Sequence, residues 1–251
     1  MKIEIMDTTL RDGEQTQGVS YSPPEKLHIA SLLLKDVRVD RIEVASARVS
    51  TGEFEALRKI TDWARQNNLH HKVEVLGFVD GDISLNWIND AGGKVITLLC
   101  KGSLRHLEKQ LRKTPDQHLN DIRAIVDKAG LMNMEVNIYL EDWSNGMLNS
   151  EDYVFYMVDA LKAENIKRIM LPDTLGILNP DQTYELCSKM TTRYPDLHFD
   201  FHPHNDYDLA VANLMAAVRA GIKGVHTTVN GLGERAGNAP LSSVIGVLRD
   251  H

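Results

Sequence analysis

Short apolar runs alternate with longer amphipathic stretches along the whole of this chain. Runs of this length, bounded by polar or turn residues, are typical of buried strands. We predict strands over residues 3–6, 41–45, 73–79, 94–99, 134–140, 168–171, 198–202 and 224–229. We predict helices over residues 25–34 and 51–67, a third helix that ends near Gly130 and a last helix that starts near Ala239. Pro23-Pro24 precedes the first of them, and prolines suit a helix start.

This alternation predicts a parallel sheet, because each strand is followed by a crossover helix. Eight such units follow one another without a linker, an internal repeat or a low-complexity tract. That number favours closure into a (β/α)8 TIM barrel that occupies residues 1–251 as one domain. A doubly wound open sheet is the alternative.

Composition narrows the class of protein. The chain has 251 residues, 43% of them hydrophobic, and a formal net charge of −7, which argues against nonspecific nucleic-acid binding. Apolar runs such as residues 31–34 are too short to cross a membrane, and residues 1–6 resemble a strand rather than a signal peptide. Cys100 and Cys187 lie in apolar segments, which suggests buried free thiols and a reducing cytoplasm.

Polar side chains gather where the predicted strands end, the edge at which TIM barrels carry their chemistry. Six of the eight strands have them, more than packing alone explains. The groups are Asp7 with Arg11 and Asp12, Glu43, Glu141 with Asp142, Asp173 with Thr174, His202 with His204, and the loop over residues 231–238.

His202 and His204 are the most informative pair. Residues two apart on a strand point to the same face, so their imidazoles form a ready pair of metal ligands. Pro203 between them cannot donate to a sheet, which predicts that the strand ends there, at the barrel mouth. Asp12 would be a third ligand. The alternative is a pair of hydrogen-bonded core histidines.

The other groups have structural interpretations too. Arg11 and Asp12 can form a plain salt bridge, and Glu43, inside an apolar strand, needs a partner such as Arg11. The loop over residues 231–238 can be a flexible turn, although its three glycines also permit close backbone approach to a ligand. Asp173 and Thr174 can simply cap a loop.

Three segments together resemble the signatures of the metal-dependent Claisen-condensing barrels: DTTLRDGEQ (7–15), HPHND (202–206) and NGLGERAGN (230–238). That family includes 2-isopropylmalate, homocitrate and citramalate synthases and 3-hydroxy-3-methylglutaryl-CoA lyase. The segments IEVASARVS (42–50) and YLEDWSNG (139–146) further resemble the citramalate synthase branch. Pro203 departs from the pattern, because relatives carry a small residue there.

The resemblance implies that Asp12, His202, His204 and Asn238 hold a divalent cation, and this donor set suits Zn²⁺, Mn²⁺ or Mg²⁺. It also implies roles for residues around the cation. Arg11 would stabilise the oxyanion and Glu43 would hold Arg11. Glu141 would contact the reacting groups, and Thr174 would bind the substrate carboxylate.

The implied reaction joins acetyl-CoA to a 2-oxo acid: the enolate of the acetyl group attacks the ketone, and thioester hydrolysis drives the reaction forward. We expect Leu76, Leu99 and Tyr139 to face the side chain of the 2-oxo acid and to leave a small apolar pocket suited to the methyl group of pyruvate. No cation for 2-oxoglutarate is expected on those strand ends. The same three residues can instead be plain barrel core.

Three functions therefore compete. A synthase is favoured over a lyase, because the lyase has a cysteine in the glycine-rich loop where this chain has Glu234 and Arg235. Within the synthases, citramalate synthase is favoured and 2-isopropylmalate synthase is the alternative. The third possibility is a non-catalytic barrel that binds a ligand.

The resemblance also bears on what surrounds the barrel. Full-length relatives continue into a helical subdomain that reaches a neighbouring protomer, and many add a regulatory domain that binds an end-product amino acid such as isoleucine or leucine. We expect this chain to lack both, to belong to a homodimer when full length, and to bind metal and 2-oxo acid while condensing acetyl-CoA slowly.

Overall fold

Eight parallel strands close into a barrel in the computed structural model, which describes residues 2–250. The strands follow chain order around the barrel, and four residue pairs join the first strand to the last, which excludes the open sheet. They are β1 (Glu4–Asp7), β2 (Arg41–Ser46), β3 (Val73–Phe78), β4 (Val95–Lys101), β5 (Glu135–Glu141), β6 (Ile169–Asp173), β7 (Phe199–Pro203) and β8 (Gly224–Thr227). The predicted TIM barrel is confirmed.

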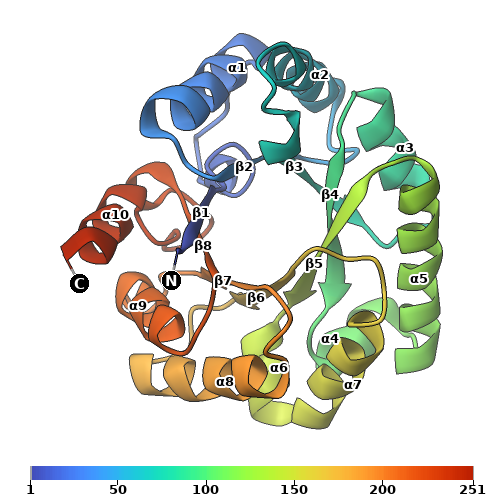
Figure 1. The fold of residues 1–251 in the computed structure, drawn as a ribbon, viewed down its shortest axis with the longest axis vertical. Helices are drawn as coiled ribbons and strands as arrows, with labels where there is room; N and C mark the ends of the chain where they lie inside the picture. The colour runs from blue at the N-terminus through green and yellow to red at the C-terminus, as the bar shows by residue number, and fades with distance from the viewer. Residues whose placement is uncertain (1, 251) are drawn as a thin grey trace.

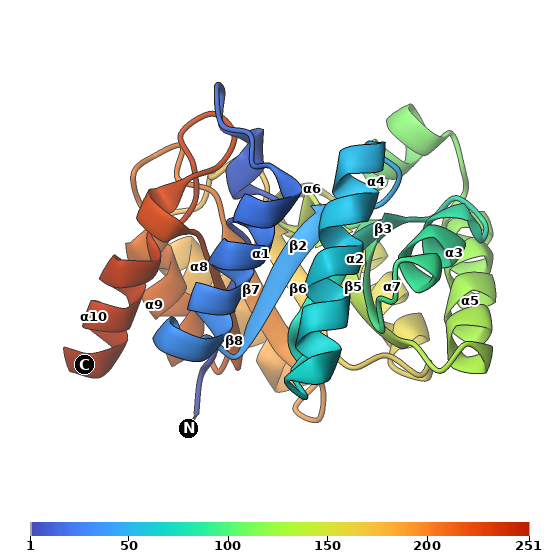
Figure 2. The ribbon, with the colours of Figure 1, turned by 90° about the horizontal axis from the view of Figure 1, so that it is seen from above.

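Helices surround the strands as an outer ring (Figure 1) and run alongside them (Figure 2). The α-helices are α1 (Pro23–Ser31), α2 (Thr51–Gln66), α3 (Ile83–Asp90), α4 (Leu104–His106), α5 (Pro115–Leu131), α6 (Trp143–Asn149), α7 (Glu151–Leu161), α8 (Pro180–Arg193), α9 (Ala210–Arg219) and α10 (Leu241–Asp250). Shorter helical segments are η1 (Gly13–Gln15), η2 (Leu32–Val37), η3 (His70–Lys72), η4 (Leu107–Leu111) and η5 (Val229–Gly231).

Local sequence explains why two of the long helices begin where they do. Thr114 and Gln117 exchange hydrogen bonds of 2.9 and 3.3 Å between side chain and backbone at the start of α5, and Asn179 and Gln182 do the same at the start of α8. A proline follows the capping residue in each case, where its missing N–H leaves no helical hydrogen bond unmade.

Some predicted boundaries are wrong by a few residues. The helix predicted over residues 25–34 starts at Pro23, and its α-helical part ends at Ser31 before the π-helical η2. The strand predicted over 224–229 ends at Thr227, and the last helix starts at Leu241. Both differences have one cause: Thr228 pairs with the segment before α10, since its N–H donates to Ala239 O at 3.1 Å and its carbonyl accepts from Leu241 N at 2.9 Å.

The main core lies between the strands and the helices, and Cys100 and Cys187 are both buried free thiols, as predicted. Inside the barrel the packing is different. A small apolar cluster of Met6, Leu76, Tyr139 and Met170 lies toward the mouth, and charged and polar side chains lie among the strands with it. Among residues 2–250, no helix has the length and apolar character needed to cross a membrane.

Candidate functional site

The loop after β1 is held rigidly at the barrel mouth. Asp7 Oδ1 accepts from Thr9 N at 2.9 Å, and the backbone N–H groups of Arg11 and Asp12 donate to Thr8 O at 3.0 and 2.8 Å. Burial raises the pKa of Asp7 to about 6, since its hydrogen bonds with Thr9 only partly offset the loss of water. Arg11 and Asp12 therefore occupy fixed positions.

Lys26 of α1 reinforces this loop from below. It is fully buried, and its Nζ donates to Leu10 O at 3.1 Å, next to Arg11 in sequence. Glu14 lies 2.5 Å from the same ammonium, and Glu53 of α2 also pairs with it. A buried lysine with two carboxylates and a carbonyl ties α1, α2 and the loop together.

Strand β7 delivers the two histidines to the same mouth. The strand ends at Pro203, as predicted, and His202 and His204 point to one side. His204 N donates to Asp173 O at 3.2 Å, and His204 also pairs with Asn238 in an isolated antiparallel bridge. This bridge brings the loop after β8 against the end of β7.

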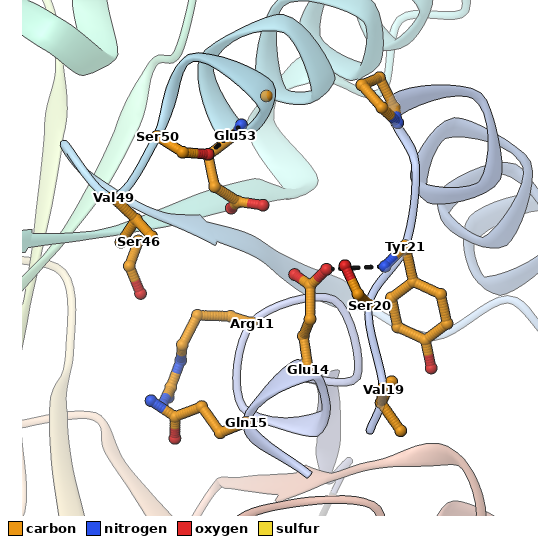
Figure 3. Close-up of a pocket in the computed structure, with 12 residues that line it drawn as sticks. Arg11, Glu14, Gln15, Val19, Ser20, Tyr21, Ser46, Val49, Ser50 and Glu53 are labelled. Atoms are coloured by element: carbon orange, nitrogen blue, oxygen red, sulfur yellow. Dashed lines mark hydrogen bonds between the residues drawn. The ribbon is translucent and has the colours of Figure 1, made fainter. Parts of the chain in front are cut away.

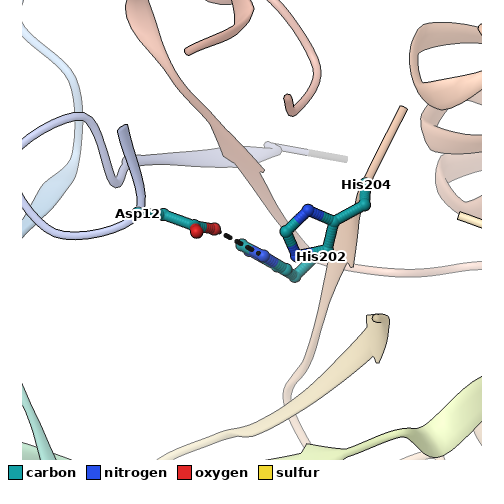
Figure 4. A group of neighbouring side chains, drawn as sticks. All are labelled: Asp12, His202 and His204. Carbon is teal, nitrogen blue, oxygen red and sulfur yellow. Dashed lines mark ion pairs between the residues drawn. The ribbon is translucent and has the colours of Figure 1, made fainter. Parts of the chain in front are cut away.

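Asp12, His202 and His204 converge (Figure 4), with one ligand atom from each lying within 4.8 Å of the others. His202 Nε2 is 3.0 Å from Asp12 Oδ2. His204 Nδ1 and Asn238 Oδ1 are buried and have no hydrogen-bond partner within the described part of the chain, and the buried Asp12 carboxylate has only the ion pairs with His202 and Arg11. Buried polar atoms are normally paired, so these side chains fit a divalent cation, with Asn238 as the fourth donor.

Electrostatics keep the donors in the right form for a cation. Burial alone would raise the pKa of Asp12, but the charge of Arg11 holds it well below its usual range. Burial, with some repulsion from His202, lowers the pKa of His204 to about 4. Asp12 is thus an anion and His204 a neutral imidazole at neutral pH.

Arg11 is the cation of this site. Its Nε donates to Glu43 at 2.6 Å and its Nη2 to the Tyr139 hydroxyl at 3.2 Å, while Nη1 lies 3.5 Å from Asp12. The predicted pairing of Glu43 with Arg11 is therefore confirmed. Burial raises the pKa of Glu43, and the charge of Arg11 opposes that shift.

A cavity of about 310 Å³ opens beside the cluster. Its lining includes Arg11, Asp12, His202, His204, Leu76, Leu99, Tyr139, Glu141, Thr174, Gln15 and Glu234. Leu76 and Tyr139 pack with Met6 and Met170, and Leu99 packs against them. Leu76, Leu99 and Tyr139 are therefore barrel core and also an apolar part of the cavity wall, and their contact with the side chain of a 2-oxo acid stays a prediction.

One of those strand ends carries a cation, Lys101, but it is not among the residues that line the cavity, so the expectation about 2-oxoglutarate stays a prediction. Lys101 is the last residue of β4, two positions beyond Leu99, and its ammonium pairs with Glu141 and with Gln110 at 2.8 Å. Glu141 lines the cavity but is held by this lysine. The pattern missed Lys101 because the predicted strand stopped at Leu99.

Asp173 and Thr174 have separate roles. Asp173 accepts from Ile177 N at 3.2 Å and Leu178 N at 3.0 Å, so it caps a turn, as its structural interpretation held. Thr174 lines the cavity, and its Oγ1 accepts from Asp142 N at 2.9 Å, which leaves its own proton free to donate.

The loop after β8 is a fixed structure rather than a flexible turn. Arg235 bonds to Asp206 at 2.8 and 3.0 Å and to Thr174 O at 2.7 Å, which ties three mouth loops together. Gly237 has φ +85°, and a side chain there would meet Gly231 O at 2.0 Å. The glycines serve the close packing of the loop on itself, and this packing presents Asn238.

A second cavity of about 440 Å³ adjoins the first (Figure 3) and shares Arg11, Gln15, Ser46 and Val49 with it. Its outer wall includes Glu14, Tyr21 and Ser50 at the start of α2. A ligand in one cavity can therefore reach into the other past Arg11.

Sequence reasoning missed two buried residues beneath the cluster, Asp200 and His226. His226 Nε2 lies 3.1 Å from Asp200 Oδ2, and His226 Nδ1 lies 3.2 Å from His202 Nδ1. The sequence carried a signal for Asp200, because it alternates with His202 and His204 along one strand. His226 could be found only from the register between β7 and β8.

Comparisons with known sequences and structures show which proteins this chain is similar to. The sequence model of the HMGL-like family matches residues 2–251. The chain is 37% identical over 249 residues to (R)-citramalate synthase CimA of Methanocaldococcus jannaschii, covering 99% of this chain and 49% of that protein. It is 35% identical over 254 residues to homocitrate synthase of Sulfolobus acidocaldarius, covering 100% of this chain and 53% of that protein.

It is also 37% identical over 247 residues to 2-isopropylmalate synthase of Pyrococcus furiosus, covering 97% of this chain and 48% of that protein. The chain thus spans about half the length of these curated relatives. Among solved structures, hydroxymethylglutaryl-CoA lyase from Pseudomonas aeruginosa shares the fold, with a TM-score of 0.84 at 19% identity over 99% of this chain and 85% of that one.

Proposed function

This chain belongs to the HMGL-like family, and from that membership we propose that it forms the barrel of an acyltransferase that condenses acetyl-CoA with a small 2-oxo acid. Pyruvate is the proposed acceptor and citramalate the product. One observation carries the proposal: the Asp12–His202–His204 cluster and Arg11, which Glu43 holds, line one cavity that also has an apolar wall.

The cation would be held by Asp12, His202, His204 and Asn238; the donor atoms of His204 and Asn238 are buried and have no other partner within the described residues. Bound there, Zn²⁺, Mn²⁺ or Mg²⁺ would supply Lewis acidity toward the ketone oxygen of the 2-oxo acid. The relatives of this chain include citramalate, homocitrate and isopropylmalate synthases, so family membership supports a synthase without choosing the substrate.

The protein's own groups orient the acceptor and take up its charge. Arg11, fixed by Glu43 at 2.6 Å, directs a guanidinium N–H at the position where the ketone oxygen becomes an alkoxide. The free proton of Thr174 donates to the substrate carboxylate, since its oxygen already accepts from Asp142 N. Glu141 borders the reacting groups from its pairing with Lys101.

The apolar wall favours a small acceptor. Leu76, Leu99 and Tyr139, backed by Met6 and Met170, leave room for the methyl group of pyruvate. One methylene in such a pocket changes binding by only about 1–3 kcal/mol, so 2-oxobutanoate should bind as well. The runner-up acceptor is 2-oxoisovalerate. Because Lys101 is a cation at the end of β4, 2-oxoglutarate is included in the test as a third acid.

The adjoining 440 Å³ cavity would receive the acyl-CoA thioester, because it meets the first cavity at Arg11 and Gln15. The acetyl methyl carbon loses a proton and forms a carbon–carbon bond to the ketone carbon. Water then cleaves the thioester and releases CoA. A cytoplasmic location and a homodimeric full-length protein complete the proposal.

The test compares binding of three 2-oxo acids to the Mn²⁺-loaded chain by titration calorimetry, with CoA release from acetyl-CoA as a second measurement. We expect pyruvate to bind at least about tenfold more tightly than 2-oxoisovalerate or 2-oxoglutarate. Tighter binding of 2-oxoisovalerate would move the assignment to 2-isopropylmalate synthase. Binding of none of the acids would overturn the proposal.

A further inference from the structure

A charged layer fills the barrel beneath the apolar cavity wall, and the proposed reaction gives it no role. Arg41 donates to Glu74 and to Asp200 at 2.6 Å each, and all three side chains are buried. Asn137 adds a 2.9 Å hydrogen bond to Glu74. Burying charges in this way is costly unless they are paired, so the layer needs an explanation beyond packing.

One branch of this layer reaches the metal cluster. Asp200 Oδ2 lies 3.1 Å from His226 Nε2, His226 Nδ1 lies 3.2 Å from His202 Nδ1, and His202 Nε2 lies 3.0 Å from Asp12. The contacts are continuous from the middle of the barrel to the cluster. His226 itself is 1% exposed.

The positions of the protons on the two imidazole rings determine which atom donates at each contact of this branch. If His202 offers its Nε2 lone pair to a cation, its neutral ring carries the proton on Nδ1. That N–H faces His226 Nδ1, which must then accept, so His226 carries its own proton on Nε2. There it donates to the Asp200 carboxylate, so the ring proton of each of the two histidines has an acceptor.

We propose that His226, oriented by Asp200, is a positioning residue that holds His202 in the tautomer and orientation required to bind the cation. The proposal rests on the proposed metal site and deepens it. In metal sites, partners that orient a ligating histidine typically contribute 10–100-fold to metal affinity.

The same ring also reaches the substrate side of the site. The Tyr139 hydroxyl lies 2.9 Å from His226 Nδ1, and Arg11 donates to that hydroxyl at 3.2 Å. The rings of Tyr139 and His202 both meet His226 edge to face, with centroids 5.7 and 5.3 Å from its own. From one position, His226 therefore contacts both Tyr139, which accepts from Arg11, and His202, which would bind the cation.

The experiment measures Co²⁺ affinity by competition with a chelator, together with the absorption spectrum of bound Co²⁺. His226→Leu removes the acceptor and should weaken binding by about 10–100-fold. His226→Asn places an oxygen near the position of Nδ1 and should restore most of the affinity.

His118→Leu is the matched control, because His118 is also buried and accepts from Lys101 N at 3.0 Å, away from the cluster. It should lower stability and leave Co²⁺ affinity unchanged. Equal affinity of the wild type and His226→Leu would overturn the positioning role while the metal site stands. Absence of Co²⁺ binding by the wild type would overturn both.

A second measurement uses the unaltered chain, so a folding failure of His226→Leu leaves the inference testable. Long-range ¹H–¹⁵N NMR of the Zn²⁺-loaded protein reports which ring nitrogen carries each proton. We expect the Nδ1–H tautomer for His202 and the Nε2–H tautomer for His226. The Nδ1–H tautomer for His226 would contradict the inference.

Discussion

Arg11 is fixed before any substrate arrives. Its guanidinium donates to Glu43 through Nε and to Tyr139 through Nη2, and both partners are buried. A lysine carries its three N–H donors on one nitrogen, so it cannot reproduce the separate positions of the Nε and Nη2 donors of Arg11. The geometry of the guanidinium, and not only its charge, therefore matters.

Arg11→Lys should weaken pyruvate binding to the Mn²⁺-loaded chain by about 10–100-fold, the loss expected for one charge-assisted hydrogen bond. Calorimetric titration measures it. Arg48→Lys is the control, because Arg48 is an arginine of the mouth that pairs with Asp80 at 2.7 Å and is 46% exposed. Unchanged affinity in Arg11→Lys would remove Arg11 from the substrate site.

His118 illustrates a buried histidine with a structural role. Its Nε2 accepts from Lys101 N at 3.0 Å, which only the neutral ring can do. Burial lowers its pKa to about 4, with Lys113 and Lys101 lowering it further and Asp121 opposing them. The unfolded chain therefore binds this proton more readily than the folded one between about pH 6.5 and pH 4.

The contribution of His118 to stability is thus present above about pH 6.5 and is lost as the pH falls toward 4. His118→Gln retains an acceptor and cannot titrate. We expect the free energy of unfolding of this variant to depend less on pH in that window, by up to about 1.4 kcal/mol per pH unit. Urea unfolding at pH 5 and pH 7 tests this, and parallel curves for both proteins would contradict it.

At the scale of elements, β8 is shaped by the residue opposite it on β7. Gly224 pairs in register with Asp200, and a Cβ on Gly224 would lie 2.0 Å from Asp200 Oδ1. The carboxylate cannot move away freely, because Arg41 and His226 hold it at 2.6 and 3.1 Å. Gly224, which has no side chain, therefore leaves room on β8 for the Asp200 carboxylate of β7.

Gly224→Ala should lower the free energy of unfolding by about 1–3 kcal/mol, as overpacking a filled interior does. Gly246→Ala is the control, and it should change the free energy of unfolding in the opposite direction. Gly246 lies in α10 with open space around its position, so alanine should stabilise the helix by about 0.5–1 kcal/mol. Denaturant unfolding of both variants measures the pair, and a fully stable Gly224→Ala would show that Asp200 relocates.

The elements could be predicted well because the strands are buried on both faces and read as apolar runs. The ends of the elements were harder to predict. Thr228, for example, leaves β8 by pairing through its backbone, which the pattern of side chains does not indicate. The convergence of Asp12, His202 and His204 followed from barrel geometry. His226 could not be placed under His202 in advance, because that contact depends on the register of two neighbouring strands.

At the scale of the whole molecule, the cluster lies across the seam where the barrel closes. Asp12 follows β1, His202 and His204 end β7, and Asn238 follows β8, while β1 and β8 pair directly. A cation held by these side chains would bind the folded chain and not the unfolded one. By mass action it should then stabilise the barrel as a unit.

Adding Zn²⁺ or Mn²⁺ at one hundred times its dissociation constant should raise stability by about 2.7 kcal/mol and the thermal midpoint by about 5–10 °C. Thermal unfolding with and without a chelator measures this shift. His204→Ala should unfold at a midpoint that metal does not change. A wild-type midpoint indifferent to both metal and chelator would show that no cation is held at the seam.

Closure of β8 onto β1 also decides when the cluster can exist while the protein is being made. On the ribosome, Asp12 emerges early, and it must wait for His202, His204 and Asn238 to be translated. A nascent chain arrested before β7 has no place to hold the ion through these side chains. A cation bound by this cluster would therefore be taken up only once Asn238 has been translated and the last strand has entered the sheet.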